Sequence, residues 1–235
     1  MTEHPRVIAG MIDIFGGWID RFGIDGFRID TARHVDPHFW QQFVPAMQAR
    51  AKARGIPNFH VFGEVYVESV DAGPLAWHTR EGGFPAVLDF AFRQAALETV
   101  AGKAATATWE RMLTGDALYQ GGAATARQLP TFVSNHDAGR FATFVRRAFP
   151  QAGEDEVLRR VMLANAMLLT LRGVPTIYYG DEQGFVGDEP RDVSAVLTGE
   201  VEHAVAADRA DTFLERAAVH VVVGFLDRVD PPDNG

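Results

Sequence analysis

The chain has 235 residues, 47% of them hydrophobic and 23% charged, which are values typical of a globular chain with a sizeable core and which exclude global disorder. Its 22 basic and 31 acidic residues give a net charge of −9, and so acidic a surface repels phosphate backbones, so we expect no nucleic-acid partner. Cysteine is absent, which excludes disulfides, thiol nucleophiles and cysteine zinc sites.

The hydrophobic pattern predicts helices and strands that alternate along the chain. In chain order it indicates helix 8–22, strand 24–30, helix 37–53, strand 59–65, strand 86–90, helix 92–113 interrupted near Gly102, strand 129–134, helix 155–171 and strand 174–179. Asp36 is placed to cap the second helix, with Pro37 at its first position. Beyond residue 188 only the run 219–226 suits a strand.

Neither a membrane span nor a secretory signal is expected from this sequence. The longest apolar stretch, residues 161–171, is too short to cross a bilayer, so we expect no membrane partner. The first residues, MTEHPRVIAGMIDIF, lack both a basic region and a small-residue cleavage site.

Alternation of strands and helices favours an α/β fold with a parallel sheet covered by helices. The strands are rich in Val, Ile and Phe, as expected where both faces of a sheet are buried. The pattern alone fits an open doubly wound sheet or a barrel. No GxGxxG or GxxxxGK[ST] motif follows a strand, which disfavours a nucleotide-binding fold.

The segment GFRIDTARHV places two charges in an apolar strand. Arg28 and Asp30 share one face of that strand, because alternate side chains point the same way. We expect the pair to lie close together in a buried setting, where the guanidinium holds the carboxylate ionised. A purely structural Arg–Asp pair is the alternative.

Polar residues also follow three other strands. Glu64 ends the strand in HVFGEVY, where an apolar surround favours the protonated form that a general acid needs; a solvent-facing Glu is the alternative. In FVSNHDAGR, Asn135, His136 and Asp137 suit a ligand-reading loop, or a turn in which Asp137 caps the next helix. In GVPTIYYGDE, packing and a turn explain most residues.

Taken together, acidic residues stand at the carboxyl ends of at least three strands predicted to be parallel. Ligands bind at that end of the sheet in α/β folds. Paired carboxylates without cysteine ligands, a Ser–His arrangement or a phosphate loop indicate glycoside chemistry. Three aromatic side chains could stack on sugar rings, Tyr66, Trp77 and Trp40, although core packing suits Trp40 better because it lies within a helical run.

The segments GFRIDTARH, FGEV, FVSNHD and GVPTIYYGDE resemble, in order and spacing, conserved motifs of the α-amylase superfamily, glycoside hydrolase family 13. The resemblance covers about residues 5–186. It implies that Asp30 is the catalytic nucleophile and Glu64 the general acid/base. It also implies that Asp137 is a third carboxylate, which orients the substrate and stabilises the transition state.

The same resemblance implies four substrate-binding residues and no metal ligand in this chain. Arg28 is the arginine beside the nucleophile, and His136 resembles the histidine that binds the sugar next to the cleaved bond. Arg33 and His34 resemble the pair that lines the neighbouring aglycone side.

Members of the superfamily have a (β/α)8 TIM barrel, and this chain resembles approximately strands four to eight of it. We therefore expect a partial glycosidase barrel over residues 1–186 and an unassigned, poorly defined tail over residues 187–235. The family's first motif and first three strands have no counterpart in the chain. Because the missing half normally supplies much of any calcium site and could have carried a signal, no cofactor and no compartment is assigned.

The implied function is that of a retaining α-glycosidase of the α-amylase type, in truncated form. Its substrate would be a starch-like α-glucan or oligosaccharide. The alternatives are an α-glucan transglycosylase or sugar isomerase of the same superfamily, and an inactive half-barrel that only binds or assembles.

A partial barrel leaves two sheet edges open, at the strands that end near Asp30 and Tyr179. Unpaired backbone groups at such edges promote pairing with other chains. We therefore expect the isolated chain to self-associate and to have weak or no activity. The run 219–226 would cover one edge at most.

Overall fold

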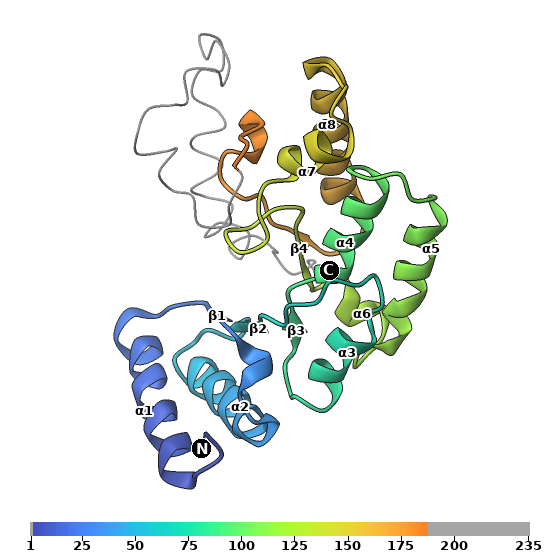
Figure 1. The fold of residues 1–235 in the computed structure, drawn as a ribbon. Coiled ribbons are helices and arrows are strands. Elements are labelled where there is room, and N and C mark those ends of the chain that lie inside the picture. The colour runs from blue at the N-terminus through green and yellow to red at the C-terminus, as the bar shows by residue number, and fades with distance from the viewer. Residues whose placement is uncertain (1, 188–235) are drawn as a thin grey trace, which may run out of the picture. The chain divides into compact units, whose positions relative to one another are not determined.

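The computed structural model describes residues 2–187, which contain eight α-helices, five β-strands and three short 3₁₀ helices (Figure 1). The α-helices are α1 (Pro5–Phe22), α2 (Pro37–Ala53), α3 (Gly73–Arg80), α4 (Phe90–Thr99), α5 (Ala107–Thr114), α6 (Ala123–Ala126), α7 (Phe141–Ala148) and α8 (Glu154–Thr170). The strands are β1 (Gly26–Ile29), β2 (His60–Gly63), β3 (Ala86–Val87), β4 (Pro130–Thr131) and β5 (Val174–Pro175). The 3₁₀ helices are η1 (Ala32–His34), η2 (Gly115–Leu118) and η3 (Asp181–Gln183). The predicted strand 219–226 lies outside the described residues.

All strand pairs of the described residues are parallel, as the sequence predicts. One sheet has the order β1-β2-β3 and a second pairs β4 with β5. A parallel bridge between Asp89 and Thr131 continues the series from the end of β3 to β4. The register opposes Ile29 to Gly63, so the residues that follow these two strands emerge side by side.

The expectation that every strand is buried on both faces is wrong for β1 and β5. Arg28 in β1 and Val174 in β5 are exposed. Within residues 2–187, β1 pairs only with β2, and β5 only with β4, so both lie at edges. The close approach of β1 and β2 requires glycine at one position, because a Cβ on Gly26 would lie 2.3 Å from the carbonyl oxygen of His60.

Helices α1 and α2 pack beside the β1 end of the sheet (Figure 1). Asp36 caps α2 as predicted, accepting a hydrogen bond of 2.8 Å from the amide of His38. Between the helices and the sheet, aromatic rings meet edge to face. Phe15 lies 5.5 Å from both Phe27 and Phe43, measured between ring centroids. This apolar cluster sets the position of β1 and of the residues at its carboxyl end.

Three helices of the structure were not expected from the sequence, namely α3, α6 and α7. All are short, with eight, four and eight residues, which is below the length at which a periodic pattern is taken to indicate a helix. The predicted interruption near Gly102 is confirmed, since α4 ends at Thr99 and α5 begins at Ala107.

A buried ionic cluster joins the end of β3 to the segment before β5. Arg172 donates hydrogen bonds to Asp89 and to both carboxylate oxygens of Asp116, at 3.1 and 2.9 Å from its Nε. The side chain of Asp89 is fully buried and also accepts the amide of Phe92, which caps α4. The cluster thus connects the start of α4, the 3₁₀ helix η2 and the segment before β5.

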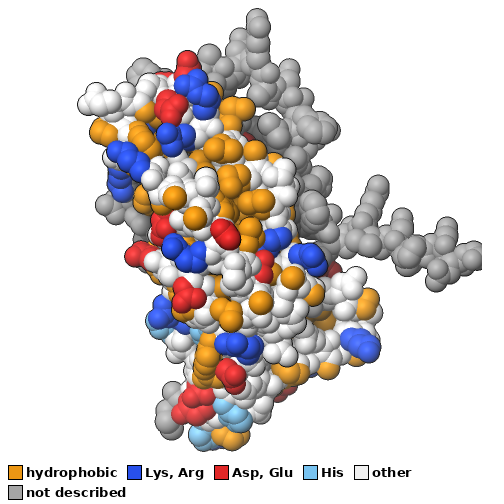
Figure 2. Space-filling view, turned by 90° about the vertical axis from the view of Figure 1, so that its right-hand side faces the viewer, with side chains coloured by type: hydrophobic (Ala, Val, Ile, Leu, Met, Phe, Trp, Pro, Cys, Tyr) orange, Lys and Arg blue, Asp and Glu red, His pale blue; other side chains and the backbone are white. Residues whose placement is uncertain are grey.

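Large apolar side chains remain exposed on the outer helices. They include Ile14, Trp18 and Phe22 on α1, and Leu158, Met162, Leu163 and Leu169 on α8. Figure 2 shows one face of the described residues on which apolar side chains gather. Within residues 2–187, none of the helices has the length and apolar character that a bilayer crossing needs.

Candidate active site

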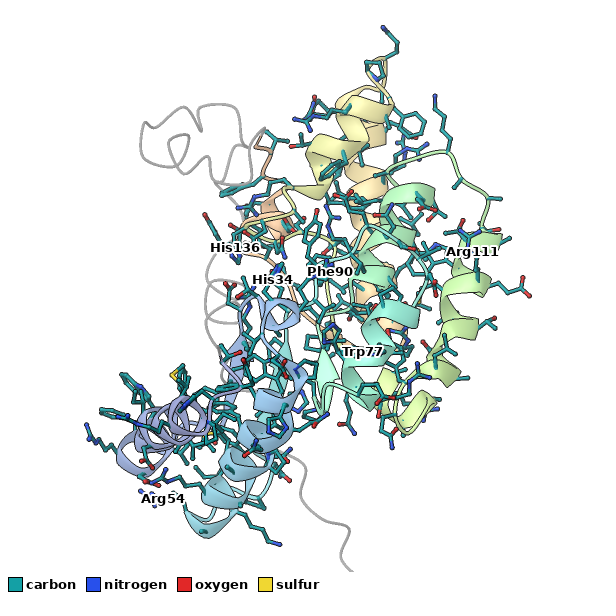
Figure 3. The ribbon with its side chains drawn as sticks, turned by 60° about the horizontal axis from the view of Figure 1, so that its bottom comes forward. His34, Arg54, Trp77, Phe90, Arg111 and His136 are labelled. Atoms are coloured by element: carbon teal, nitrogen blue, oxygen red, sulfur yellow. The ribbon has the colours of Figure 1, made fainter. Side chains whose placement is uncertain are left out.

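A pocket of about 400 Å³ lies at the carboxyl ends of the strands. The side chains that line it come from the segments after β1, β2 and β4, and are Asp30, Thr31, Arg33, His34, Glu64, Tyr66, His136 and Asp137. Figure 3 shows His34, on η1, near His136, on the loop after β4. The structure therefore brings the three predicted carboxylates to one site.

Arg28 connects two of these carboxylates. Its Nη1 donates a hydrogen bond to Asp30, and its Nη2 lies 3.3 Å from Oε1 of Glu64. The hydrogen bond from Arg28 lowers the pKa of Asp30, which keeps the carboxylate ionised as expected. The expectation that this pair is buried is wrong, because the Asp30 side chain is 62% exposed, lying just past the end of β1.

Glu64 is the buried member, with 6% of the residue exposed. Its surround is less apolar than the sequence indicates. Besides Arg28, the backbone amide of Thr31 donates to Oε2 of Glu64 at 3.0 Å. Arg28 and the Thr31 amide thus hold both carboxylate oxygens of Glu64 in place beside Asp30.

Thr31 was not singled out from the sequence. Its φ of 50° lies in the left-handed region, and it is the only non-glycine residue of the described range with a positive φ. This conformation turns the chain directly after Asp30, so that the Thr31 amide faces Glu64. No sequence signal marks it, because threonine does not favour the left-handed region.

The loop after β4 carries Asp137 and His136. Its turn is closed by Asn135, whose Oδ1 accepts the amides of Asp137 at 3.1 Å and Ala138 at 2.6 Å. His136 Nε2 lies 3.1 Å from Oδ2 of Asp137. The alternative reading of Asp137 as a helix cap is wrong, since Arg140 occupies the N-cap position of α7.

Arg33, His34 and Tyr66 line the side of the pocket next to Glu64. Arg33 donates to the backbone carbonyl of Tyr66 at 2.5 Å, and the Tyr66 hydroxyl donates to Glu68 at 2.8 Å. Burial, followed by the hydrogen bond with Glu68, raises the pKa of Tyr66, so it remains a neutral phenol that can pack against a ligand.

The other aromatic candidates do not line this pocket. Trp40 is buried and donates to the carbonyl of Ala32, which agrees with core packing. Trp77 is exposed on α3 and packs against His78. The acids of the GDE segment also lie outside the pocket lining; Asp181 is buried, and Arg140 lies 3.0 Å from it.

Across residues 2–187 there is no group of three or more His, Asp or Glu side chains placed to hold a metal ion.

The chain is similar to known proteins over most of its length. Residues 1–220 match the family described as "Alpha amylase, catalytic domain". An α-amylase of Streptomyces lividans is 41% identical over 186 residues, which are 79% of this chain and 20% of that protein. A cyclomaltodextrinase of Thermoanaerobacter pseudethanolicus is 31% identical over 202 residues, which are 86% of this chain and 32% of that protein.

Among solved structures, a cyclomaltodextrinase superposes with a TM-score of 0.63 at 30% identity, over 80% of this chain and 29% of that one. The described residues thus have the fold of part of an α-amylase-type barrel. The chain belongs to the α-amylase catalytic-domain family, and it spans about a fifth to a third of the length of the curated relatives named above.

Proposed function

From this family membership, we propose that the chain carries the catalytic carboxylates of a retaining α-glycosidase that hydrolyses α-glucosidic bonds in α-glucans or their oligosaccharides. The observation that carries the proposal is the convergence of Asp30, Glu64 and Asp137 on one pocket, with Arg28 in contact with the first two. Retaining glycosidases need one ionised carboxylate and one carboxyl that can donate a proton.

The two carboxyls differ in exposure and in contacts. Asp30 is exposed and hydrogen-bonded to Arg28, which favours the ionised nucleophile. Glu64 is buried beside it and contacts the same guanidinium. The β1–β2 register supports the pairing, because Asp30 and Glu64 follow the opposed residues Ile29 and Gly63. A retaining enzyme needs the two carboxyls about 5–5.5 Å apart.

In the proposed reaction, Asp30 attacks the anomeric carbon while Glu64 protonates the leaving glycosidic oxygen. The bond to the leaving sugar breaks, and a β-glycosyl ester forms on Asp30. Glu64, now a carboxylate, takes a proton from water, which attacks the same carbon and releases the sugar with its original configuration. Asp137 orients the substrate and stabilises positive charge as it develops.

Four further residues are proposed to bind substrate. Arg28 also fixes the two carboxylates; His136, beside Asp137, binds the sugar next to the cleaved bond. Arg33 and His34 line the aglycone side next to Tyr66. Hydrolysis is preferred over transglycosylation or isomerisation because the relatives compared above are named α-amylase and cyclomaltodextrinase.

We further propose that β1 to β5 correspond to strands four to eight of the family's barrel, within a catalytic region of residues 1–186. The edges at β1 and β5 and the exposed apolar side chains of α1 and α8 support self-association of the isolated chain. Sedimentation over a range of concentrations tests this, and a monomer at all of them would contradict it.

Hydrolysis of maltooligosaccharides by variants of the chain tests the proposed roles. Asp30→Asn and Glu64→Gln should each lower turnover by at least about 100-fold, because one removes a nucleophile and the other a proton donor. Asp25→Asn is the matched control, an exposed aspartate just before the opposite end of β1. Near-normal hydrolysis by either variant would contradict the roles. No hydrolysis by the unaltered chain would favour the alternative, a chain that binds sugar or assembles without turnover.

A further inference from the structure

Arg93 is a buried cation that the proposed reaction does not use. It lies on α4, and only 4% of the residue is exposed. No carboxylate of residues 2–187 forms an ion pair with it, and its Nε has no hydrogen-bond partner among them. A buried guanidinium without a counter-ion is costly, so its retention calls for a specific role.

The guanidinium of Arg93 contacts the loop that carries Asp137. Its Nη2 donates a hydrogen bond of 2.6 Å to the carbonyl oxygen of Ala138, the residue after Asp137. The guanidinium also lies over the ring of Phe144 in α7, 5.5 Å from its centroid. A hydrogen bond from a charged donor in a dry setting is short and strong, so Arg93 can hold this carbonyl in place.

The contact between Arg93 and Ala138 connects the loop after β4 to helix α4. The hydrogen bonds of Asn135 close the turn on itself but reach no other element. Arg140, at the far end of the loop, contacts Asp181. Arg93 contacts the middle of the loop, at Ala138. Its helix, α4, begins directly after Asp89, and Asp89 forms a β-bridge with Thr131 of β4.

The charge of Arg93 also acts on the pocket. Burial lowers the pKa of Arg93, and the nearby Tyr66 and Glu68 oppose that shift. Tyr66 lines the pocket with Asp137, and its own pKa responds to both Arg93 and Asp137. Tyr66 therefore lies within electrostatic range of both Arg93 and Asp137.

We propose that Arg93 is a positioning residue, which holds the Ala138 carbonyl and thereby fixes the direction in which His136 and Asp137 enter the pocket. Its effect on turnover rests on the proposed function, whereas its effect on the loop does not.

Hydrogen–deuterium exchange of the full chain tests the effect on the loop. In Arg93→Met, the amides of Asp137, Ala138 and Gly139 should exchange about tenfold faster, the factor expected when a hydrogen bond to a charged group is lost. Arg93→Lys, which keeps a charged donor, should restore part of the protection. Arg146→Met is the control on α7, where Arg146 is an exposed partner of Glu154. Unchanged exchange in the loop would overturn the proposal, as would equally faster exchange in α1 and α2.

A double-variant cycle on maltooligosaccharide hydrolysis tests the effect through Asp137. Arg93→Met should lower kcat by about 100-fold through misplacement of the carboxylate, with a smaller change in KM. In the Asp137→Asn background the same change should cost little more, because the group that Arg93 positions is already gone. Additive losses would overturn the proposal. If the isolated chain shows no hydrolysis, as its expected weak or absent activity allows, the exchange experiment alone decides the role of Arg93.

Discussion

Removal of Arg172 should strongly destabilise the fold, because it leaves a fully buried charge without a partner. Arg172 is 12% exposed at its side chain, and its two partners, Asp89 and Asp116, are 0% and 14% exposed. Breaking a buried ion pair from one side costs about 3–5 kcal/mol, since the remaining charge stays desolvated. We expect Arg172→Met, which keeps most of the apolar stem, to lose at least about 3 kcal/mol of unfolding free energy.

Urea unfolding followed by circular dichroism measures this loss. Arg159→Met is the matched control, because Arg159 forms an exposed pair with Glu156 on α8, and loss of an exposed pair should change the stability little. Adding Asp89→Asn to Arg172→Met should recover stability, since asparagine keeps an acceptor for the cap of α4 and carries no charge. A loss for Arg172→Met as small as that of the control would refute this reasoning.

Three further outcomes are expected from single variants. Arg28→Met should shift the acidic limb of the pH–rate profile to higher pH. Arg28 lowers the pKa of Asp30, so without it Asp30 becomes protonated, and inactive as a nucleophile, at a higher pH. An unshifted limb would argue against Asp30 as the ionised nucleophile. Asp36→Ala should cost about 1 kcal/mol in urea unfolding through loss of a helix cap, and no loss would show that the cap is dispensable. Gly26→Ala should cost about 1–3 kcal/mol, because its Cβ would meet the His60 carbonyl oxygen at 2.3 Å; wild-type stability would show that the two strands can separate freely.

Local signals in the sequence were sufficient for much of the fold. Asp36 and Pro37 mark the start of α2, and the interruption near Gly102 separates α4 from α5. The parallel arrangement follows from the alternation of strands and helices. The short helices α3 and α7 were not predicted, because a run of eight residues is too short to form a stable helix alone and depends on packing against neighbouring elements.

The candidate site was predictable as a set of residues but not as a geometry. The strand-end positions of Asp30 and Glu64 follow from the chain, since parallel strands present their carboxyl ends together. The difference in their exposure does not follow from the chain. Glu64 is buried because it follows β2, which has a strand on each side, whereas Asp30 follows the edge strand β1. The contact of Arg28 with Glu64, and the hydrogen bond from the Thr31 amide to Glu64, likewise join residues 33 or more positions apart in the chain.

The most direct test of the central claim is mass spectrometry of the chain after incubation with a mechanism-based fluoroglycoside. Such a reagent traps the glycosyl ester because its fluorine slows the second step. The account predicts one covalent adduct, on the peptide that contains Asp30, which is absent in Asp30→Asn and retained in the Asp25→Asn control. An adduct on Glu64 or Asp137, or none on a chain that hydrolyses maltooligosaccharides, would contradict it.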